Sequence, residues 1–139
     1  MNLFVTGATD VLGKAVLRQL VSKGHNIKAL SRSDGNRASL IEWDAAPVEA
    51  DVFDPASLAS AFEGCEAVLH LATKIPAIAD MKKPGIWTEN DRLRRDGMRA
   101  IVTAARETAG LHTIIYPSVS FFYADSATGG STRKARTSM

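Results

Sequence analysis

The stretch NLFVTGATDVLG (residues 2–13) sets the architecture of this chain. Residues 2–6 form a short apolar run, which is typical of a buried strand, and Gly7 ends it. From Val11 onward apolar residues recur at close to helical spacing as far as Gly24, which predicts a helix over 11–24. A strand, a glycine turn and a helix in this order bring the free N–H groups and positive dipole end of the helix to a place where a phosphate can bind.

The same alternation of strand and helix continues along the chain. Further strands are predicted at 26–30, 48–52, 67–71 and 112–117. Further helices are predicted at 36–43, 55–62 and 87–109. Asp54 and Pro55 are a helix cap and a first-turn proline, and Gly97 is a weak point in the last helix. This order predicts an α/β fold with a doubly wound, Rossmann-like parallel sheet of about five strands and helices on both faces.

Composition excludes several classes of partner. The 139 residues are 45% hydrophobic and 23% charged, as in an ordinary globular domain, and a net charge of +2 does not favour nucleic acid. No apolar run approaches the roughly 20 residues that span a bilayer. The single cysteine, Cys65, is typical of a reducing compartment, and the three histidines lack metal-ligand spacing. We expect a cytoplasmic protein that binds no nucleic acid, membrane or metal.

Several motifs together resemble one protein family. TGATDVLG (residues 6–13) is similar to the TGxxGxxG turn of extended and atypical short-chain dehydrogenase/reductases, the NAD(P)-dependent epimerase/dehydratase family. Residues 49–73 resemble that family's third strand, helix and fourth strand, and residues 94–123 resemble its long helix, fifth strand and serine-containing loop. The resemblance covers about residues 1–124. It implies an NAD(P)-binding Rossmann domain over 1–125 without the substrate domain that follows in extended members.

The resemblance also implies which residues contact the dinucleotide. Asp51 and Val52 match the pair that contacts adenine, and the end of the fourth strand matches the backbone beside the nicotinamide half. The expected cofactor-binding residues are Gly7, Thr9, Asp10, Val11, Leu12, Gly13, Ser31, Arg32, Asp51, Val52, Leu71, Ala72 and Thr73. They lie at the carboxyl ends of predicted strands, or in the turn and the first helical residues after the first strand, where ligands of doubly wound sheets bind.

Asp10 departs from the family pattern, which has a glycine there. Its carboxylate either repels a pyrophosphate or caps the helix by accepting the N–H of Leu12 or Gly13. The capping interpretation is the favoured one, and both interpretations imply weaker cofactor binding than a glycine allows.

Arg32 bears on the choice of dinucleotide. In NAD-preferring members an acid near the end of the second strand binds the ribose hydroxyls, but this chain has Ser31 and Arg32 there and no acid before Asp34. A guanidinium pairs well with a 2′-phosphate, which favours NADP over NAD. The alternative is a solvated surface arginine. For Arg94 and Arg95 the corresponding choice lies between a solvated helix face and an anionic substrate.

The catalytic pattern of the family is incomplete in this sequence. Active members use a Ser/Thr with a Tyr-x-x-x-Lys pair, whose lysine lowers the pKa of the tyrosine. Four residues after Tyr116 stands Ser120, and four after Tyr123 stands Ala127, so no such pair exists here. Ser118 and Ser120 lie near the place of the catalytic hydroxyl and are weak candidates.

Residues 126–139 differ from the rest. They contain three basic and no acidic residues and lack large apolar side chains apart from Met139, which predicts a disordered basic tail. The chain is therefore interpreted as the NAD(P)-binding part of an oxidoreductase or epimerase for a carbonyl, alcohol or nucleotide-sugar-like substrate, inactive alone. The alternatives are a non-catalytic NADP sensor and a non-functional truncated fragment. No motif selects a substrate or an oligomeric state.

Overall fold

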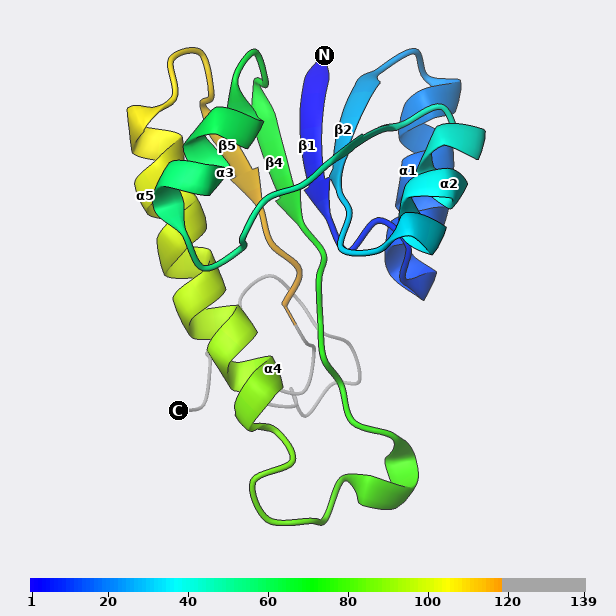
Figure 1. Cartoon of the computed structure of the whole chain (residues 1–139), viewed down its shortest axis with the longest axis vertical. Helices are drawn as coiled ribbons and strands as arrows, with labels where there is room; N and C mark the ends of the chain where they lie inside the picture. Colours follow the sequence, from blue (N-terminus) through cyan, green and yellow to red (C-terminus); the bar gives the residue numbers. More distant parts are fainter. Residues whose placement is uncertain (119–139) are drawn as a thin grey trace, which may run out of the picture.

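The computed structural model describes residues 1–118, which form one five-stranded parallel sheet with helices on both faces (Figure 1). The strands are β1 (Asn2–Thr6), β2 (Asn26–Leu30), β3 (Ala46–Val48), β4 (Ala67–His70) and β5 (Thr113–Ile115). They lie in the order β3-β2-β1-β4-β5, and every neighbouring pair is parallel. The predicted doubly wound, Rossmann-like α/β class is therefore confirmed. Ser120 and the predicted tail 126–139 lie outside the described residues.

Helices cover both faces of the sheet. They are α1 (Val11–Ser22), α2 (Asp34–Glu42), α3 (Pro55–Phe62), α4 (Thr88–Arg92) and α5 (Met98–Glu107), with a short 3-10 turn η1 (Ile78–Asp80) and a π-helical turn η2 (Leu93–Gly97). Figure 1 shows α1 and α2 on one face and α3 and α5 on the other. Among the described residues, no helix is long and apolar enough to cross a membrane.

The two halves of the core follow from the strand period of two. Leu3 and Val5 of β1 point to one face and pack with Leu17 of α1, whereas Phe4 points to the other face. Phe4 meets Phe62 of α3 edge to face, with ring centroids 4.9 Å apart and an interplanar angle of 66°. Because both faces of β1 are buried, its sequence reads as a continuous apolar run.

The long helix predicted over 87–109 is present but contains an irregular turn. α4, η2 and α5 run continuously from Thr88 to Glu107, and the π-helical turn ends at Gly97, the predicted weak point. Gly97 is buried, and a Cβ placed on it would lie 3.7 Å from Val52 and 3.9 Å from His70 Nε2. The π-helical turn therefore faces the carboxyl end of the sheet, and such turns often occur at functional sites.

The third strand was predicted in the wrong place. It spans Ala46–Val48, not 48–52, and Pro47 lies inside it. A proline is tolerated because β3 is an edge strand. After Val48 the chain turns away from the sheet, because the backbone N–H of Asp51 donates to Ser57 Oγ at 3.0 Å instead of to a strand.

The other boundaries shift by a few residues for local reasons. α2 begins at Asp34 rather than at 36, because Ser33 Oγ caps it by accepting the N–H of Asn36 at 3.2 Å. α1 ends at Ser22, and Gly24 adopts a positive φ of 80° just beyond it. Asp54 caps α3 as predicted, with its Oδ1 accepting the N–H of Ala56 at 3.1 Å. The last strand is three residues long, within the predicted 112–117.

The strand order creates one reversal point. The chain moves from β1 outward to β2 and β3, and then returns to place β4 on the other side of β1. Crevices for ligands form outside the carboxyl ends of the strands at such a point. The glycine turn after β1 and the segment after β4 lie side by side there.

Candidate functional site

The turn after β1 is packed so closely that only glycines fit at two positions. Gly7 has a φ of 71°, and a Cβ on it would lie 2.5 Å from the backbone nitrogen of Ala72. A Cβ on Gly13, in the first turns of α1, would overlap the carbonyl oxygen of Gly7. The end of β1, the start of α1 and the segment after β4 therefore meet at backbone contact distance.

The amino terminus of α1 opens onto this turn. Asp10 is the N-cap residue, and its carbonyl accepts the first helical hydrogen bond from Lys14 at 2.8 Å. Its exposed side chain accepts no hydrogen bond from the helix, so the predicted bond to Leu12 or Gly13 is wrong. The first N–H groups of α1 are left for solvent or an anion, with the carboxylate of Asp10 beside them.

The end of β2 contributes Ser31 and Arg32. Ser31 is buried, its N–H donates to Val48 at 2.9 Å and its hydroxyl donates to the Ser33 carbonyl at 3.2 Å. Arg32 is exposed, and among the described residues it has no carboxylate within 4.0 Å. The buried serine fixes the backbone, and the adjacent guanidinium reaches out over the site.

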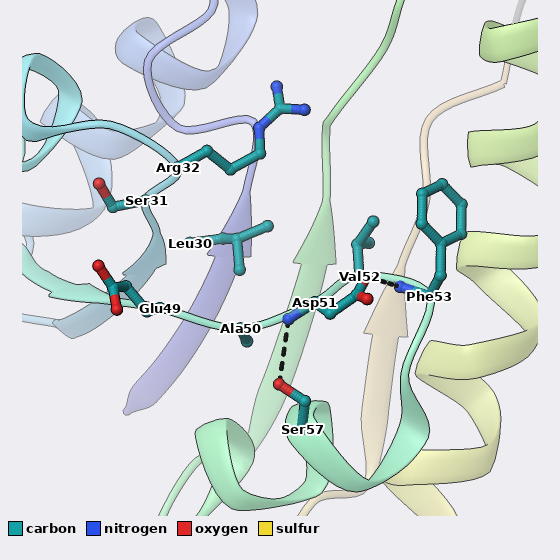
Figure 2. Close-up of a pocket in the computed structure, with 9 residues that line it drawn as sticks. All are labelled: Leu30, Ser31, Arg32, Glu49, Ala50, Asp51, Val52, Phe53 and Ser57. Atoms are coloured by element: carbon teal, nitrogen blue, oxygen red, sulfur yellow. Dashed lines mark hydrogen bonds between the residues drawn. The ribbon is translucent and has the colours of Figure 1, made fainter.

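Two hollows meet beneath Arg32. The larger, of about 570 Å³, lies between the ends of β2 and β3 and the start of α3 (Figure 2). Its lining residues are Leu30, Ser31, Arg32, Glu49, Ala50, Asp51, Val52, Phe53 and Ser57. The smaller is lined by Gly7, Thr9, Asp10, Leu30, Arg32, Asn36, Val52, Ala72 and Leu93. Leu30, Arg32 and Val52 line both, so the glycine turn and the larger hollow form one continuous site.

Asp51 shapes the floor of the larger hollow. Its N–H donates to Ser57 Oγ, and its Oδ1 accepts the N–H of Phe53 at 2.9 Å (Figure 2). The carboxylate is exposed and keeps further acceptor positions for a ligand N–H group. The guanidinium of Arg92 lies over the ring of Phe53, 3.9 Å from its centroid. This cation–π contact joins the long helix to the wall of the larger hollow.

The segment after β4 lies on the other side of the smaller hollow from Arg32 and Asn36. The N–H of Leu71 donates to the Thr6 carbonyl at 3.1 Å, and that of Ala72 donates to Thr6 Oγ1 at 3.3 Å. Leu71 is buried, whereas Thr73 is exposed. The structure therefore brings the predicted residues of β1, α1, β2, the β3–α3 loop and β4 to one edge of the sheet.

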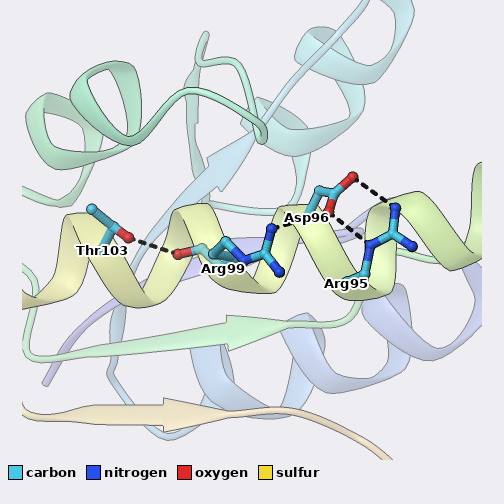
Figure 3. Close-up of polar contacts among 4 residues, drawn as sticks. All are labelled: Arg95, Asp96, Arg99 and Thr103. Atoms are coloured by element: carbon cyan, nitrogen blue, oxygen red, sulfur yellow. Dashed lines mark hydrogen bonds and ion pairs between the residues drawn. The ribbon is translucent and has the colours of Figure 1, made fainter.

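The two arginines of the long helix differ in their surroundings. Arg95 forms a two-point ion pair with Asp96 at 2.9 and 3.2 Å on the exposed helix face, with Arg99 3.7 Å from the same carboxylate (Figure 3). Arg95, more than Arg99, holds the pKa of Asp96 below its usual range. Arg94 instead lies over the ring of Tyr116, 5.4 Å from its centroid. Arg95 therefore fits the solvated-face interpretation, whereas Arg94 is directed toward the sheet.

Of the two catalytic candidates, Ser118 lies among the described residues. Ser118 is exposed and follows β5, and Ser120 lies outside the described residues. A catalytic role for either serine stays a prediction.

Several lining residues were not anticipated from the sequence. They are Leu30, Asn36, Glu49, Ala50, Phe53, Ser57 and Leu93. Asn36 and Ser57 lie in the first turns of helices that follow sheet strands, and that position was the signal available for them. Leu93 enters the site only because the long helix crosses over it.

Two buried groups carry shifted pKa values. Burial lowers the pKa of His70 below its ordinary 6.5, and the charge of Arg94 acts in the same direction, while the backbone of Leu93 opposes them. Burial raises the pKa of the Cys65 thiol although Lys28 lies nearby, so this cysteine is not activated as a nucleophile.

The lowered pKa of His70 predicts a stability that falls in acid. Below pH 6.5 the unfolded chain takes up a proton at this residue before the native chain does, so the free energy of unfolding decreases as the pH falls. The slope reaches up to about 1.4 kcal/mol per pH unit while the native imidazole stays neutral. Denaturant melts of the wild type and His70→Asn from about pH 7.5 to about pH 5 measure the difference. A constant difference between the two proteins over that range contradicts the prediction.

One family model matches almost the whole chain: an NAD(P)H-binding domain over residues 7–138. A 3-diazoavenalumate denitrifying reductase of a Streptomyces species is 35% identical over 123 residues, which are 87% of this chain and 38% of the reductase. The chain thus spans well under half the length of this curated relative.

Two solved structures share the fold. UDP-glucose-4-epimerase from Stenotrophomonas maltophila with bound NAD has a TM-score of 0.81 and 22% identity, over 99% of this chain and 43% of the epimerase. An NADPH-dependent quinone oxidoreductase from Escherichia coli, complexed with NADPH, has a TM-score of 0.61 and 27% identity, over 82% of this chain and 35% of that one. Both proteins are again much longer than this chain.

Proposed function

Because the chain belongs to the NAD(P)H-binding family, we propose that it binds NADP(H) in preference to NAD(H), as the dinucleotide-binding part of a reductase or epimerase. The observation that carries the preference is Arg32, an exposed guanidinium at the end of β2 on the rim of both hollows. No carboxylate among the described residues lies within 4.0 Å of it. It is therefore available to form a bidentate pair with a 2′-phosphate.

The parts of the site match the parts of the ligand. In this proposal the pyrophosphate lies on the amino terminus of α1, and the 2′-phosphate lies beside Arg32. Adenine enters the larger hollow, where Asp51 offers an acceptor to its amino group. The nicotinamide half lies along Leu71, Ala72 and Thr73. The likeness to structures that hold NAD and NADPH supports a dinucleotide in this crevice.

The proposed reaction is inferred from the longer proteins that this chain resembles, because the described site alone does not define one. We propose hydride transfer to or from a carbonyl or alcohol carbon, including the carbinol of a nucleotide-sugar-like substrate, as the chemistry this domain serves. The relative at 35% identity is a reductase, which supports that class. A second candidate is a sensor that binds NADP(H) without turnover. Loss of NADPH absorbance with any member of a carbonyl panel would exclude the sensor. The cytoplasmic location stays a prediction.

Asp10 is expected to weaken the binding of the dinucleotide. Its carboxylate makes no hydrogen bond to the helix, and it lies beside the proposed pyrophosphate position. Asp10→Asn removes the charge and keeps the shape, so NADPH should bind about fivefold to tenfold tighter at low ionic strength, and the gain should shrink as salt is added. Isothermal titration at two salt concentrations measures both effects. Equal affinities at low salt would mean that the carboxylate is not near the bound phosphates.

The test of the proposed function is a set of thermal melts with four ligands: NADPH, NADH, 2′,5′-ADP and 5′-AMP. A ligand at a hundred times its dissociation constant stabilises the native chain by about 2.7 kcal/mol. We expect larger shifts in melting temperature with NADPH than with NADH, and with 2′,5′-ADP than with 5′-AMP. Equal shifts within both pairs would contradict the NADP preference, and no shift with any ligand would contradict dinucleotide binding by this chain.

A further inference from the structure

A buried polar network lies beneath the segment that follows β4. Thr6 ends β1 and His70 ends β4, and both side chains are fully buried. Thr6 Oγ1 lies 2.7 Å from His70 Nδ1 and accepts the N–H of Ala72 at 3.3 Å. This N–H belongs to the same nitrogen that approaches Gly7 too closely for a side chain. The network therefore acts on the backbone that forms one wall of the crevice.

The hydrogen bonds select one form of the imidazole. A threonine hydroxyl has one proton to donate and two lone pairs to accept with. Ala72 already uses one lone pair, and within the described part of the chain the only acceptor near the Thr6 hydroxyl is His70 Nδ1. A buried hydroxyl without an acceptor is costly, so the hydroxyl donates to Nδ1. The proton of the neutral ring then sits on Nε2.

The surroundings of the ring keep it neutral and in place. Tyr116 stacks on His70 with centroids 5.4 Å apart and an interplanar angle of 16°, and Arg94 lies over the ring of Tyr116. His70 Nε2 is buried, and among the described residues it makes no hydrogen bond of good geometry, although the backbone of Leu93 lies close enough to favour a proton on the ring. A charged imidazole here would add a second cation near Arg94 without a counter-ion, which is unfavourable.

Beyond Leu71, the segment that follows β4 uses side chains as hydrogen-bond acceptors. The β4 strand ends at His70, and beyond it the N–H of Lys74 donates to the side chain of buried Asn90 at 3.0 Å. The side chain of Thr6 in β1 thus accepts the N–H of Ala72, and the side chain of Asn90 in α4 accepts the N–H of Lys74. Removal of either acceptor leaves the backbone without a partner at that point.

We propose that His70 is a positioning residue, which accepts the Thr6 hydroxyl proton at Nδ1 and so directs the Thr6 oxygen to the N–H of Ala72, fixing the backbone against which the dinucleotide lies. This inference rests on the proposed function and adds a residue that does not itself touch the ligand. Two matched pairs of variants separate positioning from packing: Thr6→Val with Thr6→Ser, and His70→Leu with His70→Asn.

The first readout is the dissociation constant for NADP⁺, measured near pH 8 by calorimetry. Thr6→Val and His70→Leu should bind about fivefold to tenfold more weakly, as expected for the loss of one hydrogen bond. Thr6→Ser keeps the hydroxyl, and His70→Asn places an amide oxygen near the position of Nδ1, so both should stay within about twofold of wild type. Wild-type affinity in folded Thr6→Val and His70→Leu would overturn the proposal.

The second readout begins with the wild type, so its first part does not depend on the folding of any variant. Nitrogen-15 imidazole spectra of the wild type should show the proton of His70 on Nε2 and none on Nδ1, and a proton on Nδ1 would overturn the proposal. The Ala72 amide should exchange faster with solvent in Thr6→Val than in Thr6→Ser, and equal rates would overturn it as well. A wild type that binds neither NADP⁺ nor NAD⁺ contradicts the proposed function, and these spectra and exchange rates still decide the role of His70 in holding Ala72.

Discussion

Gly13→Ala is expected to destabilise the chain by about 3 kcal/mol or more, the upper range for overpacking a close contact. The new Cβ would overlap the carbonyl oxygen of Gly7, which is backbone and cannot rotate away. Alanine favours helix over glycine by about 1 kcal/mol, so the loss would occur against the local preference. Relief requires α1 to move off the end of β1, which also removes its N–H groups from the proposed pyrophosphate position.

Gly35→Ala is the matched control for this substitution. Gly35 lies in α2, and a Cβ on it meets nothing within 4 Å, so alanine there should stabilise the chain by about 0.5–1 kcal/mol. Urea denaturation of both variants measures the two opposite effects. A Gly13→Ala chain as stable as wild type would mean that α1 does not approach β1 as closely as the structure has it.

Arg32→Ala is expected to weaken NADPH binding by roughly tenfold to a hundredfold, because a charge-assisted bidentate pair contributes about 1.5–3 kcal/mol. NADH lacks the 2′-phosphate, so its affinity should change by less than about threefold. Arg32→Lys keeps the charge but loses the planar fork, and its affinity for NADPH should fall between those of the other two proteins. Calorimetric titration of each protein with both nucleotides gives the ratio of its NADPH affinity to its NADH affinity.

Arg106→Ala serves as the control for loss of charge alone. Arg106 is exposed in the last turn of α5, at the opposite end of the strands from the site. Its removal should leave the ratio of NADPH to NADH affinity unchanged. An Arg32→Ala protein that keeps the wild-type ratio would return Arg32 to the solvated surface arginine considered from the sequence.

The parts of the fold that the sequence predicts well are those encoded locally. Gly7 and Gly13 mark a turn that requires the absence of side chains, and the run before Gly7 is apolar because both faces of β1 are buried. The order of strands and helices and the family resemblance, both based on such local patterns, are confirmed.

The features that were missed depend on contacts between distant residues. Pro47 looks like a strand breaker, and only its place on an edge strand makes it acceptable. Asp51 was assigned to a strand because the apolar pattern around it does not reveal that its N–H donates to Ser57 Oγ in the helix that follows. Thr6 and His70 are 64 residues apart, and nothing in either segment alone indicates that their side chains are joined by a hydrogen bond. The side chain of Asp10 is left unbonded at a capping position, which is a choice of rotamer that sequence does not encode.

The central claim is that the dinucleotide lies across the carboxyl ends of β1, β2 and β4, over the two hollows beneath Arg32. The most direct test is an NMR titration of the nitrogen-15-labelled chain with NADP⁺. The account predicts the largest amide shifts at 7–13, 31–32, 51–53 and 71–73. Shifts gathered instead at the opposite strand ends, around the hollow of about 360 Å³ lined by Asn2, Lys28 and Cys65, would contradict it.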